Sequence, residues 1–535
     1  MSDPLALIST RQTPQTEPAD PRQQQNDAGG YTFVPDDLAR LRRFLTLGST
    51  GGTYYTGERE LTRKNAGLVL ELARTRTTEV VAEVLAISTA GRAPKQNPAL
   101  FTLAAAAKLG DDDGRKAALA AVPLVARTGT HLFQFAGYLQ QFGGWGRGTR
   151  RAIGNWYVDP RRTVDDVAYQ ALKYRQRDGW THADLLRLSH PKTTEPARRE
   201  LFDWIHGRGA ELTGVPLIVA FERLQAATSV TEAADLVTLN RGLSWEMIPD
   251  RFVNEPAVWE ALLANGMPQT ALMRQLPRLT RLGLLSPLGD WTAKVAAQLQ
   301  DPERLRKARV HPINVLVAQR TYSSGKGARS TGEWAPSQPI VDALDAAFYT
   351  AFGAVEPAGR RMMLALDVSG SMTFPVSGLP LTCREASAAL ALVTAATEPA
   401  YELVGFTSGS SYRQTGLTSL AISPRQRLDD AIRAVSDLPF GGTDCSLPMQ
   451  HALRHKLEVD MFAIYTDNET WYGEIHPHQA LAQYRRETGI DARLVVVAMT
   501  ATGSTIAHPD DPGMLDVSGF DSAVPGLIGD FARGL

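Results

Sequence analysis

Hydrophobic positions in the first two thirds of the chain recur with the period of an α-helix. The segment 60–73 is typical, because four apolar side chains fall on one of its faces: Leu61, Leu68, Val69 and Leu72. Stretches that contain Gly and Pro, such as 91–94 and 265–268, end one helical pattern before the next begins. We therefore expect residues 31–357 to form a helical domain. It is either a solenoid of stacked helix pairs or an irregular all-helical fold, because no repeat consensus is evident.

The hydrophobic pattern changes after Arg361. Short apolar runs of strand length appear there, at 362–366, 403–406, 462–465 and 494–498. Helical patterns separate these runs, and uniformly apolar strands that alternate with helices are typical of a parallel sheet covered on both faces. We expect residues 358–535 to form a doubly wound α/β domain, so that the whole chain is multidomain, α followed by α/β.

Hydroxyl and carboxylate side chains follow two of these apolar runs. Asp367, Ser369 and Ser371 come directly after the first run. Asp467 follows the third run, and Thr443 lies in a glycine-rich loop between them. Open α/β sheets bind ligands at the carboxyl ends of their strands, and an all-oxygen ligand set with few carboxylates suits Mg²⁺. The sequence therefore predicts a divalent metal site, most simply for Mg²⁺.

Charge is unevenly distributed between the two parts. The whole chain has 56 basic and 57 acidic side chains and a formal net charge of −1. Residues 361–535 hold 12 basic and 20 acidic side chains, which leaves 44 basic and 37 acidic ones in the first 360 residues. The helical part is thus basic and the α/β part acidic. The near-zero total does not argue against a polyanionic partner of the helical part.

The segment 164–192 contains the most informative group of basic residues. Its pattern predicts a helix that continues past Leu172 and places Lys173 and Arg177 one turn apart, with Arg175 on a flank. After an Asp-Gly break, a second helix beginning near Thr181 carries further basic residues to its end. The candidate RNA-binding residues are Lys173, Arg175, Arg177, Arg187, His190 and Lys192. Nearby aromatic rings could stack on bases, whereas the local alternative is an ordinary solvated helix face.

Six blocks of sequence resemble the Ro autoantigen family, and the sequence is similar to its bacterial members from about residue 36 onward. They are LGSTGGTYYTGERELTRKNA (47–66), KYRQRDGWTHADLLRLSHPK (173–192), ARVHPINVLVAQRTYSSGKG (308–327), GGTDCSLPM (441–449), YTDNET (465–470) and HPDDPGMLD (508–516). The resemblance implies a TROVE module, a ring of HEAT-like helical repeats, closed by a von Willebrand factor A domain. In such A domains a metal-ion-dependent adhesion site binds the cation. By resemblance Ser369, Ser371 and Thr443 would contact it, and Asp367 and Asp467 would do so directly or through water. A carboxylate of a partner protein normally completes the coordination, and the alternative is a residual A domain without a partner.

The resemblance also implies a function in RNA metabolism. In the family, Y RNA binds the outer surface, and unpaired 3′ ends of misfolded small noncoding RNAs enter a central hole. Lys173 and Arg177 match outer Y RNA contacts, and His190 matches a residue near the hole. The assignment of Arg175, Arg187 and Lys192 rests on charge and proximity. The partners implied are Y RNA, misfolded small RNA, ribosomal RNA and the exoribonuclease polynucleotide phosphorylase tethered through Y RNA, in RNA quality control and stress survival.

Several further expectations concern the class of protein. Only two cysteines are present, which excludes a disulfide framework and favours the cytoplasm, and no run of about 18 apolar residues predicts a membrane span. The polar residues 1–30 predict a disordered tail. We expect a monomeric ring without enzymatic activity, because no catalytic constellation is evident. The competing hypothesis is a chelatase-like or adhesion-like scaffold in which the A domain acts without RNA. The missing Walker A motif and export signal argue against it.

Overall fold

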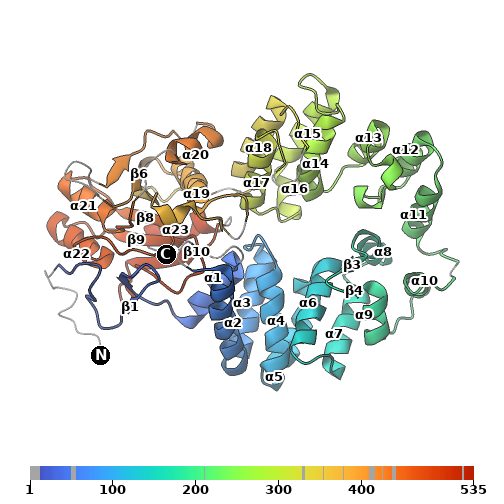
Figure 1. The fold of residues 1–535 in the computed structure, drawn as a ribbon, viewed down its shortest axis with the longest axis horizontal. Coiled ribbons are helices and arrows are strands. Elements are labelled where there is room, and N and C mark those ends of the chain that lie inside the picture. The colour runs from blue at the N-terminus through green and yellow to red at the C-terminus, as the bar shows by residue number, and fades with distance from the viewer. Residues whose placement is uncertain are drawn as a thin grey trace.

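The computed structural model shows a chain of helices that leads away from an α/β domain and returns to it (Figure 1). The structure describes residues 12–49, 53, 56–209, 211–327, 332–353, 355–376, 379–408, 416–423, 426–436, 441–520 and 523–534. Among these residues, no helix is both long and apolar enough to cross a membrane.

The first half of the helical part has two layers. Its helices are α1 Asp37–Leu47, α2 Glu58–Thr75, α3 Thr77–Ala90, α4 Asn97–Leu109, α5 Asp112–Val125, α6 Gly129–Gln141, α7 Arg147–Tyr157, α8 Val164–Lys173 and α9 His182–Ser189. Helices α3, α5, α7 and α9 pack in succession in one layer, and α2, α4 and α6 pack in the other. Such stacking is the arrangement of a solenoid, because each helix contacts the helix two places along the chain. The expected stripe on α2 is buried, as predicted: Leu61, Leu68, Val69 and Leu72.

The second half continues the circuit. Its helices are α10 Pro196–Ile205, α11 Pro216–Ala226, α12 Val230–Leu239, α13 Pro256–Ala264, α14 Gln269–Arg281, α15 Asp290–Gln300, α16 Pro302–Lys307, α17 Pro312–Ser323 and α18 Gln338–Thr350. Many of these helices begin with proline, whose fixed φ suits the first turn and whose missing N–H would be unpaired there anyway. Short 3₁₀ turns at Trp245–Met247 and Asp250–Phe252 connect α12 to α13.

The C-terminal domain has one sheet of six strands. The strands are β5 Arg361–Asp367, β6 Ala400–Phe406, β7 Leu417–Ser419, β8 Met461–Thr466, β9 Arg493–Ala498 and β10 Met514–Ser518. Their order is β10-β9-β8-β5-β6-β7, and every neighbouring pair is parallel except β6 with β7. The helices are α19 Cys383–Thr397, α20 Leu428–Ser436, α21 Leu447–Arg454, α22 Pro477–Thr488 and α23 Val524–Arg533. All four predicted strands and the doubly wound topology are confirmed.

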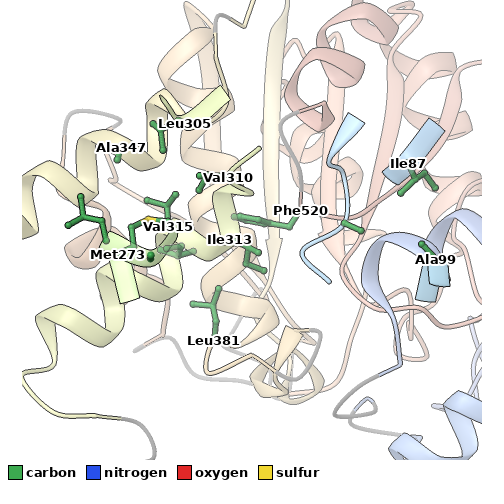
Figure 2. Close-up of a cluster of buried hydrophobic side chains, with 14 of the residues drawn as sticks. Ile87, Ala99, Met273, Leu305, Val310, Ile313, Val315, Ala347, Leu381 and Phe520 are labelled. Carbon is green, nitrogen blue, oxygen red and sulfur yellow. The ribbon is translucent and has the colours of Figure 1, made fainter. Parts of the chain in front are cut away.

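The helical circuit is closed at the α/β domain. At one end, Arg43 of α1 is buried and pairs with Asp516 of β10. At the other end, Arg320 of α17 pairs with Glu385 of α19. The two ends also meet directly, because His311 Nε2 lies 3.1 Å from the carbonyl oxygen of Arg92. One continuous cluster of buried side chains crosses this junction, and Figure 2 shows part of it: Ile87 and Ile313 from the helical part, Leu381 and Phe520 from the α/β domain.

Residues 12–33 form an ordered segment against the α/β domain. Its two short strands, β1 Gln24–Gln25 and β2 Tyr31–Thr32, pair with each other, and Phe33 forms a bridge with Thr505. Gln15 is fully buried, and Asn26 donates a 2.8 Å hydrogen bond to the carbonyl oxygen of Thr470. The prediction of a disordered tail over residues 1–30 is therefore wrong for residues 12–30, while residues 1–11 lie outside the described part. The polar side chains that suggested solvation are instead satisfied by partners in the protein.

Candidate metal centre and nucleic-acid interface

The predicted metal ligands meet at the carboxyl ends of two central strands. Asp367 is the last residue of β5, and Asp467 directly follows β8. The chain leaves β5 for β6 on one side of the sheet, whereas β8 is followed by β9 and β10 on the other side. This reversal of direction is the topological switch point, where open α/β sheets bind ligands.

Hydrogen bonds hold the loop after β5 in place. The Ser369 N–H donates to Asp367 Oδ1 at 2.9 Å, and the hydroxyl oxygens of Ser369 and Ser371 lie 3.1 Å apart. Thr466 Oγ1 donates to Asp367 Oδ2 at 2.7 Å, which links β8 to the same carboxylate. All five predicted ligands are buried, including Thr443.

Two buried oxygen atoms of this cluster have no hydrogen-bond partner in the described part of the chain. They are Thr443 Oγ1 and Asp467 Oδ2. Burial and the neighbouring Asp367 carboxylate raise the pKa of Asp467 to about 7, and burial also raises the pKa of Asp367. A divalent cation would supply both the positive charge and the contacts that these oxygens lack. The residues present therefore fit a hard cation such as Mg²⁺, with Ser369, Ser371 and Thr443 as hydroxyl ligands.

Gln15 connects the loops that carry this cluster. Its Nε2 donates to Asp444 Oδ1 at 2.8 Å, and its Oε1 accepts a hydrogen bond from Thr470 Oγ1. Thr470 Oγ1 also lies 3.2 Å from the carbonyl oxygen of Thr443. Asp444 follows Thr443 and Thr470 lies in the Asp467 loop, so one amide bonds to both loops, which hydrogen bonds from the Trp471 and Tyr472 N–H groups to the Thr443 carbonyl oxygen also join directly. A glutamine in a polar N-terminal stretch carries no pattern that predicts this contact.

The first part of the candidate RNA-binding segment differs from the prediction. Helix α8 ends at Lys173, and Arg177 lies in a hairpin formed by β3 Gln176–Arg177 and β4 Trp180–Thr181. The two turn residues, Asp178 and Gly179, both have positive φ, of 51° and 81°. Asp-Gly favours such a two-residue hairpin turn, because both positions need left-handed backbone. The prediction that Lys173 and Arg177 lie one turn apart on a helix is therefore wrong.

The second part agrees with the prediction. Helix α9 begins after Thr181, whose side chain accepts a hydrogen bond from the Asp184 N–H in a capping box. His190 ends the helix in left-handed conformation, with a φ of 44°. Arg187 exposes 68% of its side chain, and His190 and Lys192 are also exposed. These three residues thus form a solvent-accessible basic edge.

Lys173 is not a free surface cation. Its side chain is only 13% exposed, and its Nζ lies 3.2 Å from Glu246 Oε1 and 3.1 Å from the Tyr169 hydroxyl. Burial opposes the charged form, but Tyr169, Tyr174 and Glu246 outweigh it and raise the pKa of Lys173. The charge of Lys173 is therefore retained and partly neutralised by Glu246.

A cavity of about 950 Å³ brings several of the predicted residues together. Lys173, Arg175 and Arg177 line one side, and Arg274 of α14 lines the cavity as well. Two carboxylates, Glu246 and Asp250, also line it, so the four cations remain in excess. Arg274 was missed because it lies about 100 residues away from the basic segment, on a helix with no motif of its own. Arg187, His190 and Lys192 lie outside the cavity wall.

His131 also lines this cavity, next to the N-terminus of α6. Its Nδ1 is buried and has no hydrogen-bond partner within the described residues. Burial and the nearby Arg127 lower the pKa of His131 to about 4, so the ring is neutral at physiological pH. His131 therefore adds a neutral ring, and no positive charge, to the cavity wall.

Comparisons with known proteins agree with this architecture. Residues 24–210 and 217–322 match the model of the TROVE domain, and residues 361–532 match that of the Ro60 vWA domain. Over 540 residues, the chain is 41% identical to RNA-binding protein RO60 of Deinococcus radiodurans, and the match covers all of both chains. The chain belongs to the Ro60 family.

Other members of the Ro60 family support the same assignment. RNA-binding protein RO60 of Caenorhabditis elegans is 35% identical over 592 residues, which cover 96% of this chain and 90% of the relative. The crystal structure of the Deinococcus radiodurans RO (RSR) protein matches with a TM-score of 0.70 and 40% identity. That match covers 93% of this chain and all of the other. The predicted ring of helical repeats followed by an α/β A domain is confirmed.

Proposed function

We propose that this chain is a cytoplasmic RNA-binding protein of the Ro60 type. The cavity lined by Lys173, Arg175, Arg177 and Arg274 carries this proposal. It combines four cations with a neutral histidine, and the hairpin that carries Arg177 leads directly into α9, which ends at the exposed basic edge. Both relatives described above bear the name RNA-binding protein RO60, which supports RNA as the ligand.

The chemistry of the interface suits RNA better than other polyanions. Arginine donates to phosphate oxygens, and its planar group also stacks on unpaired bases. Trp180 stands in the hairpin with Arg177 and is half-buried, so part of its ring is available for stacking. Selectivity then comes from strandedness and shape more than from base sequence.

The finer proposal follows from the family resemblance. Y RNA binds the outer surface at Lys173 and Arg177, joined on grounds of charge and proximity by Arg175, Arg187 and Lys192, whereas His190 contacts RNA near the hole. Unpaired 3′ ends of misfolded small RNAs, and of ribosomal RNA, enter the opening of the ring. Y RNA tethers polynucleotide phosphorylase, and the complex acts in RNA quality control and stress survival. The closed circuit of helices supports separate sites for Y RNA and for unpaired 3′ ends, because an opening within a ring excludes wide duplexes.

The A domain has a separate role in this proposal. Asp367, Ser369, Ser371, Thr443 and Asp467 hold Mg²⁺, and a carboxylate of another protein completes its coordination. The orphaned oxygens of Thr443 and Asp467 support the metal. The metal site and the basic cavity lie on different domains, so RNA binding is independent of the metal.

The RNA proposal is tested with a labelled hairpin RNA that carries a single-stranded 3′ tail. The variant Arg177→Gln/Arg187→Gln/Lys192→Gln should bind this RNA at least tenfold more weakly at 100 mM salt. Its salt slope should be smaller by about 2, because each lost phosphate contact removes roughly 0.7–0.9. The matched control, Arg304→Gln/Arg306→Gln/Lys307→Gln on α16, removes the same charge elsewhere and should bind as the wild type. Equal affinities for both variants would contradict the assignment, and steady RNA cleavage by pure protein would contradict the absence of enzymatic activity.

The metal proposal is tested by calorimetric titration with Mg²⁺. Ser369→Ala/Ser371→Ala removes two hydroxyl ligands and should abolish binding, while RNA affinity stays unchanged. Mg²⁺ at 100 times Kd should raise the free energy of unfolding of the wild type by roughly 2.7 kcal/mol and leave that of the variant unaffected. Metal binding by a protein that does not bind RNA would instead favour the scaffold hypothesis.

A further inference from the structure

Helix α7 presents an exposed face of arginines. Arg147, Arg150 and Arg151 are exposed and lie at positions i, i+3 and i+4, which share one side of a helix. The opposite side is buried through residues such as Ile153 and Trp156. The helix contains no Asp or Glu, and none of the three arginines forms an ion pair within the described residues.

This arrangement is unfavourable for the helix itself. The N-terminus of a helix is the positive end of its dipole, yet Arg147 is the first residue of α7 and no acidic residue lies in the first turn. Gly146 at the N-cap supplies no side-chain hydrogen bond either. The α7 face therefore carries positive charge that no ion pair within the described part of the chain compensates.

The neighbouring helix α5 shows the usual arrangement. It begins with Asp111 as N-cap, followed by Asp112 and Asp113 in the first turn. Its two cations, Arg115 and Lys116, pair with these carboxylates. Helices α5 and α7 pack against each other, so two neighbouring helices differ in whether acidic residues of the same helix compensate their cations.

Helix α7 lies against the candidate RNA-binding segment at both of its ends (Figure 1). Just before the helix, the Trp145 ring is 5.3 Å from the Trp180 ring of the hairpin. Near its end, Gly154 lies so close to the turn after α9 that an added Cβ would stand 3.5 Å from Pro191. Gly154 follows Arg151 by three residues and Arg147 by seven, so the arginine stripe leads directly to the turn that carries His190 and Lys192.

We propose that Arg147, Arg150 and Arg151 bind the sugar-phosphate backbone of the same RNA that contacts the end of α9. This inference rests on the proposed RNA-binding function and extends the interface onto a helix outside the predicted segment. Because this face offers cations to phosphates and no contacts to base edges, its contribution to RNA affinity is independent of the RNA sequence and depends strongly on salt concentration.

The first test compares two double variants that remove equal charge. Arg150→Gln/Arg151→Gln should lower affinity for the tailed hairpin RNA at least fivefold at 100 mM salt and reduce the salt slope by 1 to 2, as expected for roughly 0.9 per phosphate contact. Arg115→Gln/Lys116→Gln on α5 should match the wild type. An unchanged salt slope of RNA binding in the α7 variant would overturn the inference and would instead indicate that this face binds an acidic protein.

A second variant separates binding from folding. Arg147→Glu places a carboxylate at the positive end of the helix dipole, so it should keep or raise the unfolding midpoint. The same substitution should weaken RNA binding more than Arg147→Gln, because it repels phosphate. RNA affinity equal to that of the wild type would contradict the inference. Wild-type protein that binds no RNA would refute the proposed function itself, which makes the two failures distinguishable.

Discussion

Gln15, a residue of the N-terminal segment, forms hydrogen bonds that link two loops of the A domain. It joins Asp444 to Thr470 from outside the sheet, and both neighbours belong to loops that carry proposed metal ligands. Burial raises the pKa of Asp444 to about 6, and the hydrogen bond from Gln15 counteracts this effect by favouring the carboxylate. Residues behind the ligands commonly set metal affinity by fixing the geometry of the ligands.

Gln15→Leu should therefore weaken Mg²⁺ binding about tenfold, within the range found for residues that support metal ligands. Leucine keeps the volume of the side chain, so the loss reports the hydrogen bonds rather than a cavity. Asp444 keeps its hydrogen bonds from Ser446, and the loss of the buried Gln15 hydrogen bonds should reduce the free energy of unfolding by about 1–3 kcal/mol. Calorimetric titration and chemical denaturation measure the two effects.

The matched control for this variant is Gln25→Leu. Gln25 belongs to the same N-terminal segment but is exposed, and its side chain donates a 3.1 Å hydrogen bond to the carbonyl oxygen of Gly29. It should leave Mg²⁺ affinity unchanged. Equal Mg²⁺ affinity for Gln15→Leu and the wild type would show that the segment only covers the domain.

At the scale of elements, the hairpin of β3 and β4 determines where Arg177 points. Its turn depends on positive φ at Asp178 and Gly179, and the register pairs Arg177 with Trp180. An arginine and an aromatic ring thus stand opposite each other across the hairpin, next to the cavity. A continuous helix would have placed Arg177 on the face of Lys173, away from Trp180.

Gly179→Ala tests whether this turn matters for RNA. No atom lies within 4 Å of an added Cβ, so the effect comes from the backbone alone, and left-handed conformation costs a non-glycine residue about 1–2 kcal/mol. RNA affinity should fall several-fold as the hairpin loosens. Gly67→Ala in the exposed middle of α2 also has open space and should instead stabilise the protein by up to about 1 kcal/mol. RNA affinity that responds alike to both substitutions would refute a role for the hairpin.

Strong, long patterns in the sequence predicted elements well, and short ones did not. The buried strands and the metal loop follow from apolar runs and from Asp367, Ser369 and Ser371 at fixed spacing. The hairpin was missed because two-residue strands have no periodicity, although Asp178-Gly179 was itself a turn signal. Strand β10 was missed because Asp516, which pairs with Arg43, interrupts its apolar pattern.

At the scale of the whole molecule, the ring depends on contacts between residues far apart in sequence. Arg43 is fully buried and reaches Asp516, the carbonyl oxygen of Thr502 at 3.0 Å and that of Ser504. The seam between Arg92 and His311 closes the circuit a second time. Neither junction has a local signature, because each joins residues far apart in the sequence, and the contacts of Gln15 and Arg274 share this property.

Arg43→Ala should weaken the closure of the ring. Removing one partner of a buried ion pair leaves Asp516 with only its hydrogen bond from Thr505 and leaves two carbonyl groups without their Arg43 donor, which costs about 3–5 kcal/mol. We expect the denaturation profile to split into separate transitions of the helical and α/β parts. The neighbouring Arg42 forms an exposed pair with Glu83, and Arg42→Ala should cost less than about 1 kcal/mol. A single, unshifted transition for Arg43→Ala would contradict the closure described here.

Mapping the RNA contacts directly tests the central claim, that the basic cavity and the adjoining edge bind RNA. A tailed hairpin RNA containing 4-thiouridine would be crosslinked to the full chain by ultraviolet light, and the attached peptides identified by mass spectrometry. We predict crosslinks in the peptides that contain 174–192, with further crosslinks near His131 and Arg274. Crosslinks confined to the A domain, or spread evenly over the chain, would contradict the account.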